Sequence, residues 1–171
     1  MKKIIVINGP SCAGKSTIVD KIFETKQDIF WLKFDAIKRF FIDYDSSSDK
    51  QKVTEILVVI GKDRIERQED ILLEDHNAVS DYKNTEVLDY AKEKGYSVYE
   101  YNIEAPYDVL LSRFRLRASN PRPGIKINSS EKRHKSFYDK YLEGKNANIK
   151  TFDTSLQSAE EISKEILSDI L

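Results

Sequence analysis

The chain has 171 residues, with 28 Lys or Arg against 29 Asp or Glu, and a formal net charge of -1. This near balance argues against a protein that coats nucleic acid by charge alone. The length fits one domain over residues 1–171, and the single cysteine excludes an intrachain disulfide and a Cys-rich zinc site. No apolar run is long enough for a membrane span, and the N-terminal one is too short for a signal peptide, so we expect a cytoplasmic protein.

Predicted strands and helices alternate along the chain. Short apolar runs indicate strands, and apolar side chains at helical spacing indicate helices. In chain order the prediction is strand 3–7, helix 16–23, strand 29–34, helices 35–41 and 49–68, strand 70–73, helix 80–94, strand 96–103, helices 106–117 and 130–143, strand 149–152 and helix 158–171. This order predicts an α/β fold of three layers, with helices on both faces of a mostly parallel five-stranded sheet. Ligands of such sheets bind beyond the carboxyl ends of the strands.

The first predicted strand is followed by Gly-Pro-Ser-Cys-Ala-Gly-Lys-Ser-Thr at residues 9–17, which matches the phosphate-loop pattern G-x-x-x-x-G-K-[ST]. The glycines allow a tight path whose backbone N–H groups point at one anion, as does the N-terminus of the next helix. Lys15 would reach the β- and γ-phosphates, Ser16 a Mg²⁺ ion and Thr17 the α-phosphate. The predicted nucleotide-binding residues are Gly9, Ser11, Cys12, Ala13, Gly14, Lys15, Ser16 and Thr17.

Asp35 follows the second predicted strand and begins a helix. A carboxylate at this place could take the proton of an acceptor hydroxyl, as the base of a kinase does, or could only cap the helix. Lys38 and Arg39 lie one turn further along the same helix. They could bind an anionic group of the acceptor or belong to a solvated face.

Two carboxylates, Glu74 and Asp75, end the third predicted strand. One of them should hold Mg²⁺ through water, together with Ser16. The parity of the strand decides which of the two faces the phosphate loop, and the sequence leaves both open.

Residues 113–135 carry eight basic side chains and one acidic one, whereas the rest of the chain has 20 basic and 28 acidic ones. A cationic lid that closes over the transferred phosphoryl group is one interpretation, and a solvated basic helix or a nucleic-acid surface are the others. Arg113 and Arg117 are four residues apart and share a helix face, while Arg122 lies in a Pro-Gly segment. These three arginines are the candidates for contact with the phosphates.

No guanine-reading Asn-Lys-x-Asp sequence is present, which argues against a GTPase. The first hypothesis is an ATP- and Mg²⁺-dependent kinase that transfers the γ-phosphate to a hydroxyl of a small molecule, nucleoside or nucleotide. The alternatives are a polynucleotide 5′-hydroxyl kinase and a nucleotide-binding regulatory module without phosphotransfer.

Residues 8–17 and 31–35 resemble the P-loop small-molecule kinases, above all the chloramphenicol phosphotransferase-like proteins. Polynucleotide kinases and zeta-toxin-type kinases are similar more distantly. Residues 106–117 and 152–162 are similar to the lid entry and to the last strand and helix of these kinases. The resemblance implies a P-loop NTPase fold with an arginine-rich lid and ATP and Mg²⁺ as cofactors. It also implies a base at Asp35, lid arginines on the phosphates, and Thr154 and Ser155 near the adenine.

Overall fold

The computed structural model describes residues 2–74, 84–120 and 130–170. Among these residues, five strands form one sheet in the order β2-β3-β1-β4-β5, and every neighbouring pair is parallel. The predicted α/β fold is therefore confirmed, and the sheet is parallel throughout its described length. The strands are β1 (Lys3–Asn8), β2 (Ile29–Lys33), β3 (Asp70–Glu74), β4 (Ser97–Glu104) and β5 (Lys150–Asp153).

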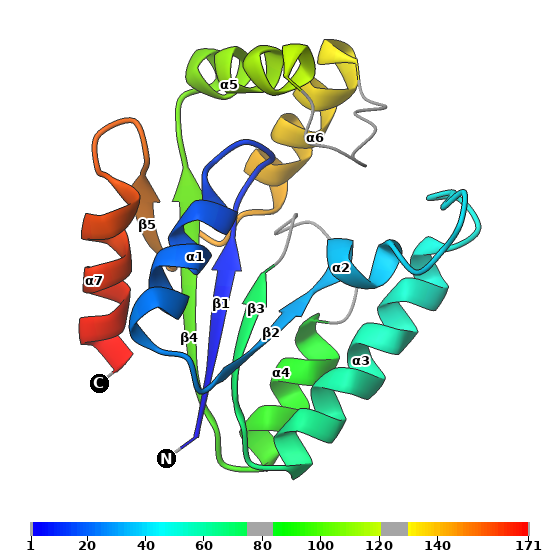
Figure 1. Ribbon diagram of the computed structural model, residues 1–171, viewed down its shortest axis with the longest axis vertical. Helices are drawn as coiled ribbons and strands as arrows, with labels where there is room; N and C mark the ends of the chain where they lie inside the picture. Colours follow the sequence, from blue (N-terminus) through cyan, green and yellow to red (C-terminus); the bar gives the residue numbers. More distant parts are fainter. Residues whose placement is uncertain (1, 75–83, 121–129, 171) are drawn as a thin grey trace.

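Helices cover both faces of the sheet, which makes three layers (Figure 1). The pair α1 and α7 packs on one face, and the pair α3 and α4 covers the other. Helices α5 and α6 lie beyond the carboxyl ends of the strands, at the top of Figure 1. The helices are α1 (Lys15–Thr25), α2 (Phe34–Lys38), α3 (Lys50–Glu66), α4 (Asn84–Glu93), α5 (Tyr107–Ser119), α6 (Glu131–Gly144) and α7 (Ala159–Ile170).

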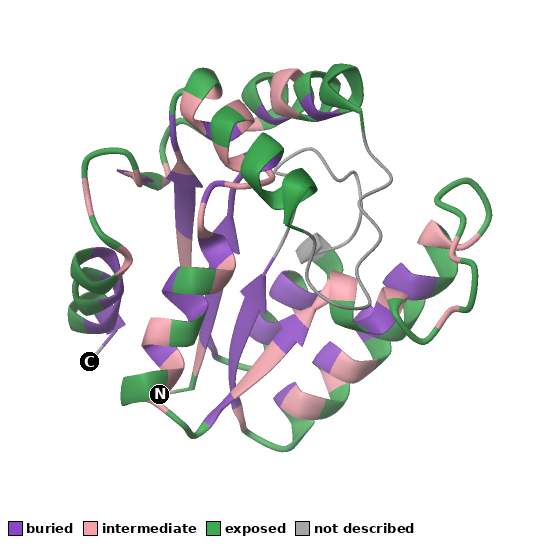
Figure 2. Ribbon diagram, turned by 45° about the horizontal axis from the view of Figure 1, so that its top comes forward, coloured by how far each residue is buried: buried purple, intermediate pink, exposed green. Residues whose placement is uncertain are grey.

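The central strand β1 is buried on both of its faces (Figure 2). Ile5 and Ile7 join the core beneath α1 and α7, whereas Ile4 and Val6 join the core beneath α3 and α4. Successive side chains of a strand point to opposite faces, so a strand buried on both sides reads as a continuous apolar run. This explains why the sequence predicts β1 so clearly. Because β1 is the central strand, the loop that follows it lies at the middle of the sheet edge.

Helix α2 corrects one prediction. The sequence predicts a helix over 35–41 with Asp35 as its N-cap, but the helix runs from Phe34 to Lys38 and Lys33 is the N-cap. The N-cap interpretation of Asp35 is therefore wrong, and Asp35 lies inside the first helical turn. The helix ends before the next apolar residues: the side chain of Phe40 is 82% exposed, whereas Phe41 packs against the core beneath α3 and α4. No helix in residues 2–74, 84–120 and 130–170 is long and apolar enough to cross a membrane.

Candidate active site

The loop between β1 and α1 has a path that depends on its glycines. Gly9 has φ +149°, and a Cβ atom added there would lie 2.1 Å from the Ile103 carbonyl oxygen of β4. Gly14 is the N-cap of α1 with φ 94°, and Cys12 adopts φ 66° although it has a side chain. Only glycine adopts such angles without strain, so the loop has the tight conformation that the sequence predicts.

Lys15 folds back over this loop and is 5% exposed. Its Nζ donates to the carbonyl oxygens of Gly9, at 2.6 Å, and of Pro10, at 2.9 Å. A buried ammonium needs such partners, because burial without them removes its solvation. The positive charge of Lys15 is thus held against the loop, beside the N-terminus of α1, where the positive end of the helix dipole adds to it.

Ser16 and Glu74 come together at the carboxyl ends of the strands. The Ser16 hydroxyl donates to Glu74 Oε1 at 2.9 Å, and the Glu74 side chain is buried. Hydroxyl and carboxylate oxygens are the ligands that Mg²⁺ accepts, with phosphate oxygens and water completing its coordination. The pair therefore fits a magnesium ion bound with a nucleotide. The other predicted carboxylate, Asp75, lies outside the described residues.

Lys33 joins this pair, although it is not among the site residues that the sequence predicts. Its Nζ donates to Ser16 Oγ at 3.0 Å and lies 2.8 Å from Glu74 Oε2. Lys33 is the last residue of β2 and stands directly opposite Glu74 in the β2–β3 register. A signal was present in the sequence, since a lysine ends the strand two residues before Asp35. Its partner became apparent only with the pairing of the strands.

Asp35 lies close to Lys38 and Tyr44, at the outer end of β2. The Asp35 side chain is 32% exposed, and its Oδ1 lies 3.7 Å from Lys38 Nζ. The Lys38 ammonium lies 4.9 Å from the centroid of the Tyr44 ring. Burial raises the pKa of Tyr44, and the negative charge of Asp35 raises it further, while the positive charge of Arg133 on α6 opposes the shift. The predicted acceptor residue Arg39 is exposed, just past the end of α2.

The candidate arginines have different surroundings. Arg113 donates to Thr154 Oγ1 at 2.8 Å and to the Thr154 carbonyl oxygen at 2.9 Å, and its Nη1 lies 3.4 Å from the Cys12 carbonyl oxygen. Its guanidinium is therefore fixed beside the phosphate loop. Arg117 is exposed on α5, although it is only one turn away. Arg122 lies outside the described residues.

Thr154, directly after β5, contacts both the phosphate loop and the end of β4. Its backbone N–H donates to the Glu104 carbonyl oxygen at the end of β4, and its hydroxyl lies 2.9 Å from the Ala13 carbonyl oxygen. Ser155 instead donates its hydroxyl to Asp153 Oδ1 at 2.6 Å. The β5–α7 turn thus lies against the phosphate loop, and the role of Thr154 and Ser155 near the adenine, which the resemblance implies, remains a prediction.

Helix α6 is anchored near the loop by His134, another residue that the sequence did not single out. The imidazole is buried, with its centroid 4.7 Å from the Phe114 ring and 5.7 Å from the Tyr107 ring. Burial lowers the pKa of His134 from 6.5, and the backbone of Ser11 opposes this only in part. Neither ring nitrogen has a well-aligned hydrogen bond within the described part of the chain. Neutral imidazole is therefore the favoured form.

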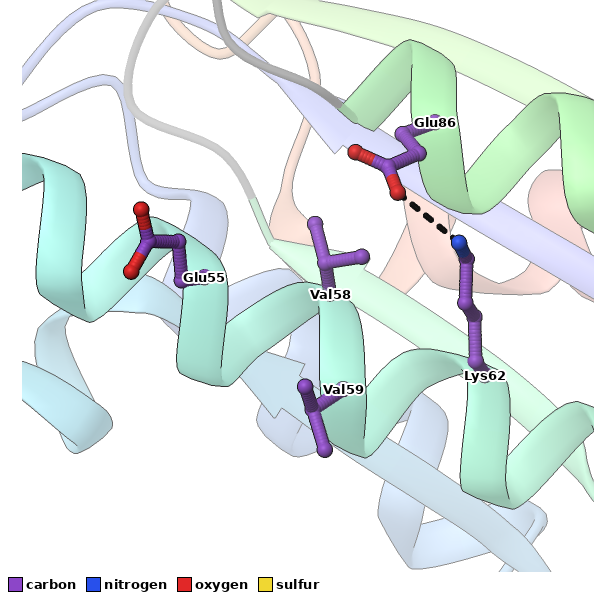
Figure 3. Close-up of a pocket in the computed structure, with 5 residues that line it drawn as sticks. All are labelled: Glu55, Val58, Val59, Lys62 and Glu86. Carbon is purple, nitrogen blue, oxygen red and sulfur yellow. Dashed lines mark hydrogen bonds and ion pairs between the residues drawn. The ribbon is translucent and has the colours of Figure 1, made fainter.

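A surface hollow lies away from these groups, between α3 and α4 (Figure 3). Lys62 Nζ and Glu86 Oε1 face each other across it at 2.8 Å. The hollow lies on the helices that cover the sheet rather than at the carboxyl ends of the strands, so we assign it no part in the candidate site. Its lining residues are Glu55, Val58, Val59, Lys62 and Glu86.

Solved structures that share this fold include several kinases. A sugar kinase from Janibacter sp. HTCC2649 has a TM-score of 0.65 at 16% identity, over 98% of this chain and 94% of that chain. An APS kinase from Mycobacterium tuberculosis, in complex with AMPPNP and APS, has a TM-score of 0.69 at 13% identity, over 98% and 96%. A shikimate kinase from Acinetobacter baumannii, in complex with shikimate, has a TM-score of 0.62 at 18% identity, over 99% and 93%. No family model and no curated protein matches the chain. The chain therefore shares the α/β fold of these kinases.

Proposed function

We propose that this protein is an ATP- and Mg²⁺-dependent kinase that transfers the γ-phosphate to a hydroxyl of a small molecule, nucleoside or nucleotide. The observation that carries the proposal is one arrangement at the carboxyl ends of the strands. A phosphate loop with Lys15 folded into it lies beside the oxygen pair of Ser16 and Glu74, with Asp35 on the adjacent α2. The fold shared with kinases that act on small molecules supports the same conclusion.

In this proposal the loop N–H groups and Lys15 bind the β- and γ-phosphates. Ser16 and Glu74 would hold Mg²⁺, which neutralises phosphate charge when it is bound. Asp35 orients the acceptor hydroxyl and accepts its proton as the new oxygen–phosphorus bond forms and the bond to the ADP oxygen breaks. Arg113, Arg117 and Arg122 would surround the phosphates from the lid. Catalysis then comes mainly from positioning and charge stabilisation.

The surroundings of Asp35 bear on the kind of acceptor. Lys38 lies beside it, and Arg133 acts on the same Tyr44 ring from α6. A cation beside the proposed base, with a second positive charge acting on the neighbouring Tyr44, suits an acceptor that carries an anionic or strongly polar group next to its hydroxyl. Lys38 and Arg39 are the proposed contacts, and membership of the chloramphenicol phosphotransferase-like group stays a prediction.

The test is incubation with γ-labelled ATP and Mg²⁺ over a panel of sugars, nucleosides, nucleotides, oligonucleotides and antibiotic alcohols. We expect label on at least one small-molecule hydroxyl. Lys15→Ala should reduce the transfer by at least about a hundredfold, since it removes the cation on the transferred phosphates. Lys21→Met, which removes a lysine of α1 that pairs with Glu24, is the control and should transfer normally. Binding of ATP without a labelled product on any acceptor would overturn the kinase proposal and indicate a regulatory module.

The exposed cations of α5 and α6 favour one second candidate, a polynucleotide 5′-hydroxyl kinase. Arg117, Lys132 and Arg133 are exposed, whereas Arg115 is paired with Glu131 at 2.7 Å. If the acceptor is an oligonucleotide, its binding should weaken steeply with salt because cations are released from its phosphates. Oligonucleotide binding that is absent or independent of salt would exclude this candidate.

A further inference from the structure

Lys33 places an ammonium in contact with both groups that the proposed function assigns to the metal, which also bond to each other. Its Nζ lies 2.8 Å from Glu74 Oε2 and 3.0 Å from Ser16 Oγ. Its side chain is 17% exposed, so most of its length is covered by protein. An ammonium in this place has the same two oxygen-bearing neighbours that would coordinate Mg²⁺.

Three features hold Lys33 there. The β2–β3 register sets Lys33 directly opposite Glu74, so strand pairing brings the two side chains together. The ion pair is with a buried carboxylate, where screening by solvent is weak. The ammonium also lies 4.7 Å from the centroid of the Trp31 ring, a favourable distance for a cation–π interaction. Lys33 is thus a positioned cation and not a freely moving surface lysine.

An ammonium and a divalent ion cannot occupy this position together. Lys33 Nζ already contacts Ser16 Oγ and Glu74 Oε2, and a Mg²⁺ ion held by Ser16 and Glu74 would need oxygens of the same two residues. The ammonium and the ion would also repel each other at such short range. Metal binding therefore requires the Lys33 ammonium to withdraw from Glu74.

Ser16 belongs to the phosphate loop, so a cation 3.0 Å from its hydroxyl lies at the rim of the phosphate site. We propose that Lys33 is the resident cation of the magnesium position. It supplies positive charge to the nucleotide phosphates and competes with Mg²⁺ for Ser16 and Glu74. The inference rests on the proposed function, and it predicts that nucleotide binding depends only weakly on divalent cations.

The experiment measures the Kd of a fluorescent, non-hydrolysable ATP analogue in EDTA and in Mg²⁺. For the wild type we expect the two values to agree within about threefold, because coupling between metal and nucleotide is small. In Lys33→Met the ratio of the Kd in EDTA to the Kd in Mg²⁺ should rise at least about tenfold, since metal-free binding loses a cation and Glu74 becomes available to the metal. Lys33→Arg keeps the charge and should keep a small ratio. Lys21→Met, which removes an ion pair with Glu24 and no contact with Ser16, Glu74 or Lys33, should behave as the wild type.

An unchanged ratio in Lys33→Met would overturn the inference, as would a Lys33→Arg variant that behaves like Lys33→Met. If Lys33→Met does not fold, Lys33→Gln replaces it with the same expected rise. Lys15→Ala separates the two proposals. Loss of nucleotide binding in Lys15→Ala, together with label transferred from ATP by the wild type, supports the proposed function even where the Lys33 ratio does not change. A wild type that binds no nucleotide under either condition overturns both.

Discussion

Gly9 shows how a single residue fixes the geometry of the site. It combines φ +149° with an approach to the Ile103 carbonyl oxygen that leaves no space for a side chain. Lys15 then closes the loop by donating to the Gly9 carbonyl oxygen. The backbone of the loop and the position of the Lys15 charge therefore depend on the same glycine.

Gly9→Ala should lower the free energy of unfolding by more than about 2 kcal/mol, since the new Cβ must displace backbone as well as adopt a strained φ. Gly95→Ala is the matched control. Gly95 also has a positive φ, +80°, but among the described residues no atom beyond its chain neighbours lies within 4 Å of an added Cβ. That variant should lose only about 1 kcal/mol. Urea denaturation gives both values, and equal losses would show that the contact with Ile103 does not matter.

At the residue scale, the sequence predicts those site residues whose positions depend only on their neighbours in the chain. The loop residues and Lys15 follow from one contiguous motif, because their geometry is set by neighbours in the chain. Lys33 could not be found in this way, since its role depends on the register between β2 and β3, which no local pattern encodes. The β1–β3 register sets Glu74 opposite Ile7, close to the loop that carries Ser16, and the sequence left this contact open between two carboxylates.

At the scale of elements, α6 is held above the loop by a buried neutral histidine. His134 packs between Tyr107 and Phe114, and Tyr141 of the same helix donates to Glu104 at 2.6 Å. The sequence predicts the helix from its spacing, and Ser130 caps it by accepting from the Arg133 N–H. A histidine within a basic helix gives no sign of burial, so its position emerged only from the packing of α6 on α5.

The lowered pKa of His134 predicts a pH dependence of stability. Below about pH 6.5 the unfolded chain takes up a proton that the folded protein resists, so the contribution of His134 is present above that pH and is lost as the pH falls. The free energy of unfolding should therefore drop between pH 7.5 and pH 5.5, and by less in His134→Phe, as measured by urea denaturation. Equal drops in both proteins would mean that the imidazole charges freely in the folded state.

At the scale of the whole molecule, the parallel sheet brings separate segments to one edge. The loop after β1, the ends of β2 and β3, and the β5–α7 turn are far apart in sequence, and all lie at the carboxyl ends of the strands (Figure 1). The alternation of strands and helices predicted this edge, and it predicted which loops meet there. The same edge carries the basic segments of α5 and α6, so the near-zero net charge of the chain conceals a strongly basic region next to the candidate site.

The most direct test of the kinase proposal is a substitution of Asp35, with nucleotide binding and phosphate transfer measured separately. Asp35→Asn keeps the shape of the side chain and removes its ability to accept a proton, and Asp20→Asn on the exposed face of α1 is the matched control. With the acceptor found in the labelled-ATP panel, we expect Asp35→Asn to bind the ATP analogue as the wild type does while kcat falls by at least about a hundredfold. Normal transfer by Asp35→Asn would contradict the role of Asp35 as the base.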